Sequence, residues 1–211
     1  MNVTLLSRKL KASTLPETLK IRLHRAISWL KSAEKQAENL DMKFISLWIS
    51  FNACYAVDLN GISTKSEKAK LRDFTSSLVD FDRTRLYNLF WEKYSGPVKV
   101  LIENKFVFEK FWEYTRGESQ DYQIAFNKSI ETATNCLSKQ NIEGLLEIVL
   151  ERLYTLRNQI IHGGATYNSK LNRSQLRDAC NIIQLLVPII IDIMLENGEH
   201  DWGEIAYPVV K

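Results

Sequence analysis

The sequence predicts an all-α protein, and three observations lead to this prediction. Apolar residues recur at intervals of three and four along most of the chain, whereas the alternating patterns typical of strands are scarce. Pro16 and the glycine pair at 163–164 stand where helices with this spacing would begin and end. Hydrophobic residues make up 45% and charged residues 25% of the chain, as in soluble globular proteins. We expect the 211 residues to form a single domain.

The helical pattern divides the chain into long and short segments. Between the long segments, residues 62–120 are expected to form an insertion of shorter helices near 64–81, 84–94 and 98–115, separated by Gly and Pro residues. We expect the long helices to build a bundle with four principal members. The first long segment begins near Pro16, and the others cover residues 41–59, 121–139, 142–162 and 173–197.

The cysteines and the apolar runs limit the class of protein. The three cysteines are widely spaced and lie in apolar surroundings, so we expect buried free thiols in a reducing cytoplasm, without disulfides or a zinc site. The N-terminus lacks the long apolar segment of a signal peptide. Residues 182–195 are strongly apolar but short for a membrane span and are interrupted by polar residues. They predict a core helix of a cytoplasmic protein with no membrane partner.

Positive charge is concentrated in the first part of the chain. Residues 1–35 contain eight lysines and arginines and two glutamates, a net charge of +6, whereas the whole chain has a net charge of +3. Lys20 and Lys31 belong to a basic stripe along the helix expected after Pro16, so they are candidates for contacting a phosphate backbone. A solvated helix face explains the same charges and is the more common reason for them.

Two further features have a structural and a functional interpretation. Asn52 stands in a segment that is apolar almost all round. An amide in such a place is usually a hydrogen-bonded core residue, but it can also reach a site between helices. Residues 62–120 are rich in aromatic side chains interleaved with Lys and Arg, which can stack on nucleobases but more often pack against one another.

The stretch LYTLRNQIIHGGA, residues 153–165, combines features that an ordinary helix end does not need. Two glycines end the helix, so His162 lies in its last turn. Asn158 and His162 share one face, whereas Arg157 is roughly 7.5 Å along the axis and 140° around it from His162. A guanidinium suits phosphate, an amide can orient it, and an imidazole can carry a proton. Each residue alone is more often structural; the combination favours a site.

RNQIIHGG, together with FISLWISFNACYAVDLNG earlier in the chain, resembles the HEPN superfamily. Its signature is an arginine followed four to six residues later by a histidine, with a polar residue usually directly after the arginine. The resemblance covers most of the chain. It implies a helical bundle that commonly dimerises, with the Arg/His helices facing each other across a cleft. Many HEPN proteins are metal-independent ribonucleases, and many are toxins or effectors in bacterial defence systems.

The resemblance also implies roles for residues of the motif. Arg157 would stabilise the negative charge at the attacked phosphate, and Asn158 would orient the arginine or the histidine. His162 would act as general base on the ribose 2′-hydroxyl or as general acid toward the leaving oxygen. HEPN toxins that are neutralised by a nucleotidyltransferase antitoxin often carry a tyrosine two residues after the histidine. That position is Gly164 here, and the nearest tyrosine is Tyr167.

Cleavage through the 2′-hydroxyl requires a proton acceptor, a proton donor and a cation at the phosphorane, but no metal or cofactor. Because one chain supplies one motif histidine, a two-fold homodimer is the simplest source of the second. We therefore expect an RNA substrate, a homodimer, and an antitoxin or regulatory protein as a further partner. The expected substrate contacts besides the motif are Asn52, Lys20, Lys31 and Tyr167.

Two other interpretations remain open. The chain can be a HEPN module that binds nucleotide, RNA or a protein without cutting, because a complete Arg/His pair does not prove turnover. It can also be an unrelated helical interaction protein in which the motif is a coincidence. The last interpretation would be favoured if Arg157 and His162 were buried apart in separate contacts.

Overall fold

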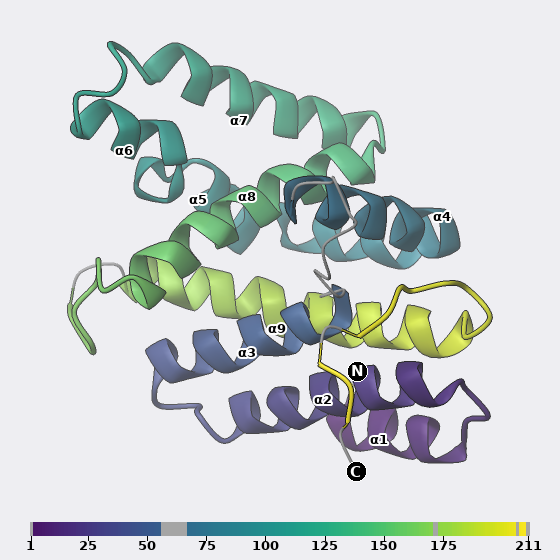
Figure 1. Ribbon diagram of the computed structural model, residues 1–211. Helices are drawn as coiled ribbons and strands as arrows, with labels where there is room; N and C mark the ends of the chain where they lie inside the picture. Colours follow the sequence, from purple (N-terminus) through teal and green to yellow (C-terminus); the bar gives the residue numbers. More distant parts are fainter. Residues whose placement is uncertain (1, 56–66, 171–172, 206, 210–211) are drawn as a thin grey trace. The chain divides into compact units, whose positions relative to one another are not determined.

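The computed structural model describes residues 2–55, 67–170, 173–205 and 207–209, and these are helical with connecting turns and no strand (Figure 1). The all-α prediction is therefore confirmed for this part of the chain. The elements in chain order are α1 (Val3–Ala12), α2 (Glu17–Glu34), α3 (Leu40–Tyr55), α4 (Glu67–Lys93), the π-helix η1 (Tyr94–Val98), α5 (Lys99–Ile102), the 3₁₀-helix η2 (Lys105–Val107), α6 (Glu109–Thr115), α7 (Gln123–Ser138), α8 (Ile142–Ile161) and α9 (Arg173–Glu196).

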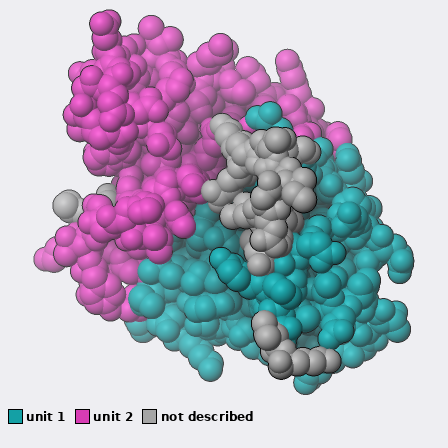
Figure 2. All heavy atoms as spheres, in the orientation of Figure 1, with its two compact units in different colours: residues 1–38, 42–82, 183–211 teal, residues 39–41, 83–182 magenta. Residues whose placement is uncertain are grey.

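The chain divides into two compact units, shown in different colours in Figure 2. Unit 1 consists of residues 1–38, 42–82 and 183–211, and unit 2 of residues 39–41 and 83–182. The helices α4 and α9 each contribute one part to each unit. The division of α4 falls at Asp82, whose backbone angles of φ −152° and ψ 74° interrupt the helix.

Unit 1 holds its apolar core between α1, α2, α3 and the later part of α9. In it, α1 packs against α2. The nearly all-apolar surface of α3 is covered, as its sequence predicts, by side chains of its neighbours. The ion pair between Lys9 Nζ and Asp192 Oδ1, at 2.5 Å, joins α1 to α9 within this unit. Fully buried apolar residues of unit 1 include Leu6, Leu23, Ala26, Phe44, Leu47, Phe51, Leu78 and Val187.

Arg22 lies in the interior of unit 1, although its place in the basic N-terminal stretch suggests a surface residue. Its side chain is 2% exposed. Nη1 donates to the Cys54 carbonyl at 2.9 Å, and Nη2 donates to the carbonyls of Gly203 at 2.8 Å and Glu204 at 3.1 Å. Burial lowers the pKa of the guanidinium. Arg22 therefore fastens the end of α3 and the C-terminal segment to α2.

Unit 2 is organised around α8. In Figure 1, α7 lies alongside α8, and the short elements α5 and η2 also pack against it. Arg152 is buried inside this unit at 1% exposure, with its guanidinium 4.4 Å from the Phe108 ring centroid. Nη2 of Arg152 donates to the hydroxyl of Ser129, and burial lowers the pKa of the arginine to about 10.

The predicted helix positions agree with the structure in the following parts of the chain. The helices expected at 121–139 and 142–162 are present as α7 and α8, and α4 has its break between the predicted segments 64–81 and 84–94. The predicted end of the 41–59 helix and the start of the 62–120 insertion lie outside the described residues, because residues 56–66 are not described. The bundle of four principal helices and the single domain stay predictions.

The expectation that the first helix begins near Pro16 was wrong, because α1 precedes it. Asn2 caps α1 by accepting a hydrogen bond from the Thr4 backbone N–H at 2.8 Å, and Val3, Leu6 and Leu10 form its buried side. This spacing of three and four is visible in the sequence, within the positively charged stretch of residues 1–35. The later helix, α2, does begin directly after Pro16.

The cysteines and the apolar last helix are buried to the extent that the sequence predicts. Cys54, Cys136 and Cys180 are buried and free, and burial raises the pKa of the Cys54 thiol to about 12. By length and composition, α9 could cross a membrane. However, 67% of its most apolar window is buried, as expected for the core helix of a soluble protein. The cytoplasmic location stays a prediction.

Replacing Arg22 with alanine should destabilise unit 1 strongly. Three carbonyls would lose their donor in a buried environment, so we expect the free energy of unfolding to fall by about 3 kcal/mol. Chemical denaturation followed by circular dichroism measures this change. Arg25→Ala, a half-exposed arginine on the same helix, is the matched control and should change stability by no more than about 0.5 kcal/mol. Equal effects of the two substitutions would contradict the assigned role of Arg22.

Candidate functional site

The helix that carries the motif is α8, and both of its ends are well defined. At its start, Asn141 accepts a hydrogen bond from the Gly144 backbone N–H at 3.1 Å. At its end, His162 is the C-cap residue, and Gly163 follows with a φ of +74°, which favours glycine. The predicted glycine stop is therefore confirmed. The buried side of α8 includes Leu145, Leu146, Val149, Leu153 and Leu156.

Arg157 and Asn158 are in direct contact near the end of α8. The Arg157 guanidinium donates from Nη1 to Asn158 Oδ1 at 2.9 Å, and its Cζ lies 5.8 Å from the centroid of the Tyr154 ring. Nε of Arg157 is buried without a hydrogen-bond partner in the structure. Among the described residues, the partners of the guanidinium are thus a neutral amide and an aromatic ring, and neither carries a negative charge that would balance its positive charge.

His162 stands exposed one turn after Asn158. With Arg157 taken as the reference direction around α8, Ile161 lies at roughly 40°, Asn158 at 100°, His162 at 140° and Gln159 at 200°. Ile161 is also exposed, at 49%. The motif residues therefore span a sector of roughly 140° at the helix end, with the half-buried Arg157 and the exposed His162 at its two edges and Asn158, which accepts the hydrogen bond from Arg157, between them. This is not the arrangement of separate buried contacts that a coincidental motif would favour.

Gln159, inside the motif, connects α8 to the segment before α6. Its Nε2 donates to the Phe106 carbonyl at 2.5 Å, and Trp112 Nε1 donates to the same carbonyl at 2.8 Å. The sequence pattern does not predict this role for Gln159. Its position between Arg157 and His162 was the available signal, but the partner is 53 residues away and could not be identified from spacing.

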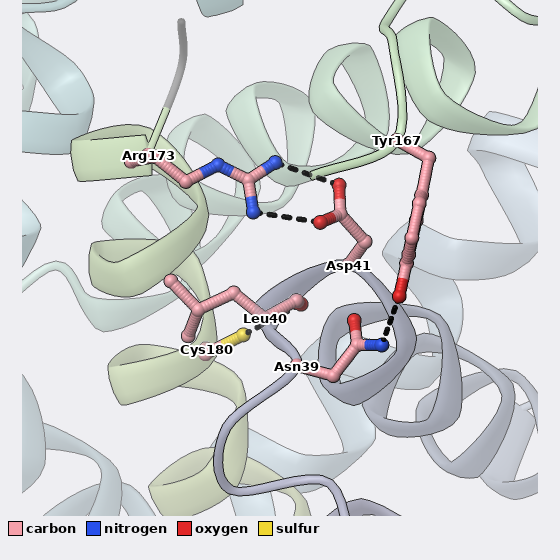
Figure 3. A network of polar contacts seen from close by, with 6 residues as sticks. All are labelled: Asn39, Leu40, Asp41, Tyr167, Arg173 and Cys180. Atoms are coloured by element: carbon pink, nitrogen blue, oxygen red, sulfur yellow. Dashed lines mark hydrogen bonds and ion pairs between the residues drawn. The ribbon is translucent and has the colours of Figure 1, made fainter. Parts of the chain in front are cut away.

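The loop after the motif is held by a network of polar contacts within unit 2 (Figure 3). Asp41, at the start of α3, accepts two hydrogen bonds from the Arg173 guanidinium, at 2.6 and 2.8 Å. This interaction lowers the pKa of the Asp41 carboxyl, and the Asn168 backbone contributes to the shift. Tyr167 accepts a hydrogen bond from Asn39 Nδ2 at 2.7 Å. The network thus holds Tyr167 and the start of α9 in the part of the chain that follows the motif.

A small cavity of about 120 Å³ lies between α8, this loop and the start of α9. It is smaller than typical small-molecule pockets, which measure about 300–1,000 Å³. A polynucleotide would therefore not fit inside this cavity. The residues that line it are Leu156, Ile160, Gly164, Ala165, Thr166, Ser169, Arg173 and Leu176.

The other predicted substrate contacts belong to both units of the chain. Tyr167 is 65% exposed, but its hydroxyl is engaged by Asn39. Asn52, Lys20 and Lys31 belong to unit 1, whereas the motif belongs to unit 2. Lys31 is exposed and Lys20 is half-buried. Asn52 is half-buried, and its Oδ1 is a buried atom without a hydrogen-bond partner in the structure. The expected roles of these residues stay predictions.

In residues 2–55, 67–170, 173–205 and 207–209, no group of three His, Cys, Asp or Glu side chains is placed to hold a metal ion. No protein-family model matches the chain, and comparisons with curated proteins and with solved structures gave no significant match.

Asp41→Asn should destabilise the protein at neutral pH by about 1.5–3 kcal/mol, because Arg173 would lose hydrogen bonds to a charged acceptor. The pKa of Asp41 is lowered on folding, so its contribution is present above the unfolded-state value near ~3.9 and is lost as the pH falls through the lower folded value. The difference between wild type and variant should therefore shrink below about pH 4. Denaturation midpoints measured from pH 7 to pH 3 test this dependence.

Glu118→Gln is the matched control for this experiment. Glu118 also accepts two hydrogen bonds from one guanidinium, at 2.6 and 2.8 Å from Nε and Nη2 of Arg116, but this pair is exposed to solvent. Its removal should leave the denaturation midpoint unchanged, because water screens exposed ion pairs. A pH-independent difference between wild type and Asp41→Asn would contradict the ionised role of Asp41.

Proposed function

We propose that this chain is a HEPN-type, metal-independent endoribonuclease that cleaves RNA by attack of the ribose 2′-hydroxyl. The observation that carries the proposal is the Arg157–Asn158 hydrogen bond beside the exposed His162 at one helix end. This arrangement places the amide between the cation and the imidazole, which lie roughly 140° apart around the helix, so a phosphate would contact both across the helix edge or between two copies of the helix. A toxin or defence effector restrained by an antitoxin or a regulatory protein is the biological setting that the motif resemblance suggests.

In this proposal, Arg157 binds the phosphate that is attacked. Its guanidinium has no carboxylate partner among the described residues, and the hydrogen bond to Asn158 leaves other N–H groups for a phosphate oxygen. Charge on the phosphate oxygens increases as the 2′-oxygen attacks. A positioned guanidinium stabilises this charge more strongly in the transition state than in the ground state.

His162 carries protons in the proposed reaction. One imidazole takes the proton of the 2′-hydroxyl while the 2′-oxygen forms its bond to phosphorus. The bond between phosphorus and the 5′-oxygen then breaks, and this oxygen takes a proton from a second imidazole. The products are a 2′,3′-cyclic phosphate and a free 5′-hydroxyl. Because the motif has one histidine per chain, a second copy of the chain supplies the other proton carrier.

The exposed Ile161 supports a contact between two copies at this place. It lies between Arg157 and Asn158 around α8 and is 49% exposed, so an apolar side chain stands within the polar motif sector. A two-fold contact through such a residue would remove it from water and bring two motif helices together.

A second candidate function is a HEPN module that binds a phosphate-containing ligand or a protein without cutting. The observation that favours it is the surroundings of His162. Within the described part of the chain, its imidazole has no hydrogen-bond partner that would fix its orientation for proton transfer. The same Arg157 and Asn158 would bind phosphate in either case, and the two functions differ in turnover.

We expect wild type to cleave a mixed pool of single-stranded RNA in the presence of EDTA and to leave 2′,3′-cyclic phosphate ends. His162→Ala and Arg157→Ala should each lower the cleavage rate by at least about 100-fold, because proton transfer and charge stabilisation contribute roughly 10²–10⁴-fold and 10²–10³-fold, respectively. Analysis of the product ends by mass spectrometry identifies the reaction.

The controls use the same residue types at exposed positions outside the motif, His24→Ala on α2 and Arg177→Ala on α9. Both should cleave like wild type. Circular dichroism should show unchanged helix content for all four variants, since His162 is exposed and Arg157 lies near a helix end. Full activity of either motif variant would disprove the mechanism. Absence of cleavage by every protein, including wild type, would favour the binding module.

We expect a dimer in solution, and Ile161→Glu should convert it to a monomer because two buried carboxylates would repel each other at a two-fold contact. Sedimentation velocity at micromolar concentration measures the change. Ile124→Glu is the matched control, since Ile124 is 77% exposed on α7. A wild-type monomer would remove the source of the second histidine and with it the proposed reaction scheme.

A further inference from the structure

Phe106 combines an exposed side chain with a firmly held backbone. Its ring is 41% exposed, yet its N–H donates to Asn104 Oδ1 at 2.9 Å and its carbonyl accepts from both Trp112 and Gln159. The bond to Asn104 caps the 3₁₀-helix η2, whereas the two bonds to the carbonyl come from α6 and α8. The bonds fix the place and direction of an aromatic ring that water can reach.

The surroundings of the ring combine aromatic surface with positive charge. Phe111 meets Phe106 edge to face, with ring centroids 5.4 Å apart and planes at 87°, so Phe106 is supported from one side. The Lys105 ammonium lies 5.4 Å from the Phe106 centroid and 5.3 Å from the Phe111 centroid. Lys105 is exposed and has no carboxylate partner among the described residues.

This group of residues lies beside the motif within unit 2. Gln159, which binds the Phe106 carbonyl, precedes His162 by three residues on α8. Side chains at this spacing are neighbours on a helix surface, with about 5–6 Å between their Cβ atoms. A nucleotide whose phosphate lies at Arg157 and His162 could therefore place a base near Phe106.

We propose that the exposed face of Phe106, with the Lys105 ammonium beside it, is the subsite that holds an unpaired nucleobase of an RNA bound at the α8 motif. The inference rests on the proposed function and specifies its substrate as single-stranded. A base in a duplex is stacked on its neighbours on both faces, so the ring is open to unpaired bases alone. Lys105 attracts the adjoining phosphate, and stacking on Phe106 positions the strand.

The chemistry of the surface favours a nucleobase over a protein partner. A stable protein interface buries about 800 Å² on each side and needs a contiguous apolar centre. Phe106 stands at the edge of a cluster of rings that continues through Phe111 to Trp112 and Tyr122. An exposed ring next to a cation, as Phe106 is beside Lys105, is the combination that single-strand binding proteins use for each base. Stacking is also tolerant of base identity, so this subsite predicts selectivity for unpaired over paired RNA and weak preference among bases.

The test measures affinity in a background that cannot cut. Fluorescence anisotropy with a short, labelled single-stranded RNA of mixed sequence is recorded for the full chain carrying His162→Ala, in EDTA. Adding Phe106→Ala should weaken binding roughly tenfold, whereas Phe106→Trp should retain it, because stacking needs an aromatic face. Lys105→Gln should weaken binding and lower the slope of log affinity against log salt by about 1, as expected for one lost phosphate contact.

Trp91→Ala is the matched control, because Trp91 is a 59% exposed aromatic residue of unit 2 that lies on α4. It should bind the RNA like the background protein. Equal affinity of the Phe106→Ala and background proteins for RNA would overturn the subsite and leave the ribonuclease proposal standing. If Phe106→Ala keeps RNA affinity but disrupts self-association in sedimentation, the surface is a protein contact and the inference is also wrong.

Two further outcomes separate the subsite from the proposed function. Selective loss of single-strand affinity in Phe106→Ala, together with absence of cleavage by wild type, would support the subsite and assign it to a non-cleaving module. If the background protein binds no RNA at all, the subsite is refuted. Cleavage by wild type, measured separately through its product ends, then decides whether the ribonuclease proposal survives.

Discussion

The paired hydrogen bonds between Asp41 and Arg173 are the constraint on which the candidate site depends. They join the start of α3 to the start of α9, and the loop that leaves the motif lies between His162 and Arg173. Asp41 is 5% exposed, so its charge is stabilised by the guanidinium and not by water. The neighbouring contact between Asn39 and Tyr167 anchors the middle of the same loop. The two contacts thus hold Tyr167 and the start of α9, which follow the end of α8 in the chain.

The buried arginines show how this chain uses its positive charge. Arg22 donates hydrogen bonds to three carbonyls in unit 1. In unit 2, Arg152 lies against the Phe108 ring and donates a hydrogen bond to a serine hydroxyl. Both guanidinium groups lose hydration on folding, which lowers their pKa. Arg157 differs, because its partners among the described residues are a neutral amide and an aromatic ring, and its Nε is unpaired in the structure. Such a group gains more from an anionic ligand than an arginine whose hydrogen bonds are already complete.

The sequence predicted the features that depend on local pattern. The all-α class, the end of α8 at Gly163 and the accessible place of His162 follow from periodicity and from a residue that tolerates positive φ. It did not predict that Arg22 is buried, because charge counts carry no information on burial. It also could not pair Asp41 with Arg173, since 132 residues separate them and neither stands in a motif. Tertiary packing decides which polar residues pair over long sequence distances, and local spacing carries no information about such pairs.

The order of side chains around α8 explains how one helix end could serve a second copy and a substrate at once. Ile161 lies toward Arg157, whereas Gln159 lies beyond His162 on the opposite flank, where it binds the Phe106 carbonyl. Under the two proposals, the flank of Ile161 faces the second copy and the flank of Gln159 faces the unpaired base. His162 stands between these flanks, so its imidazole would meet the ribose at the boundary of the two contacts. Dimerisation would then complete the proton-transfer chemistry without covering the surface that recognises single-stranded RNA.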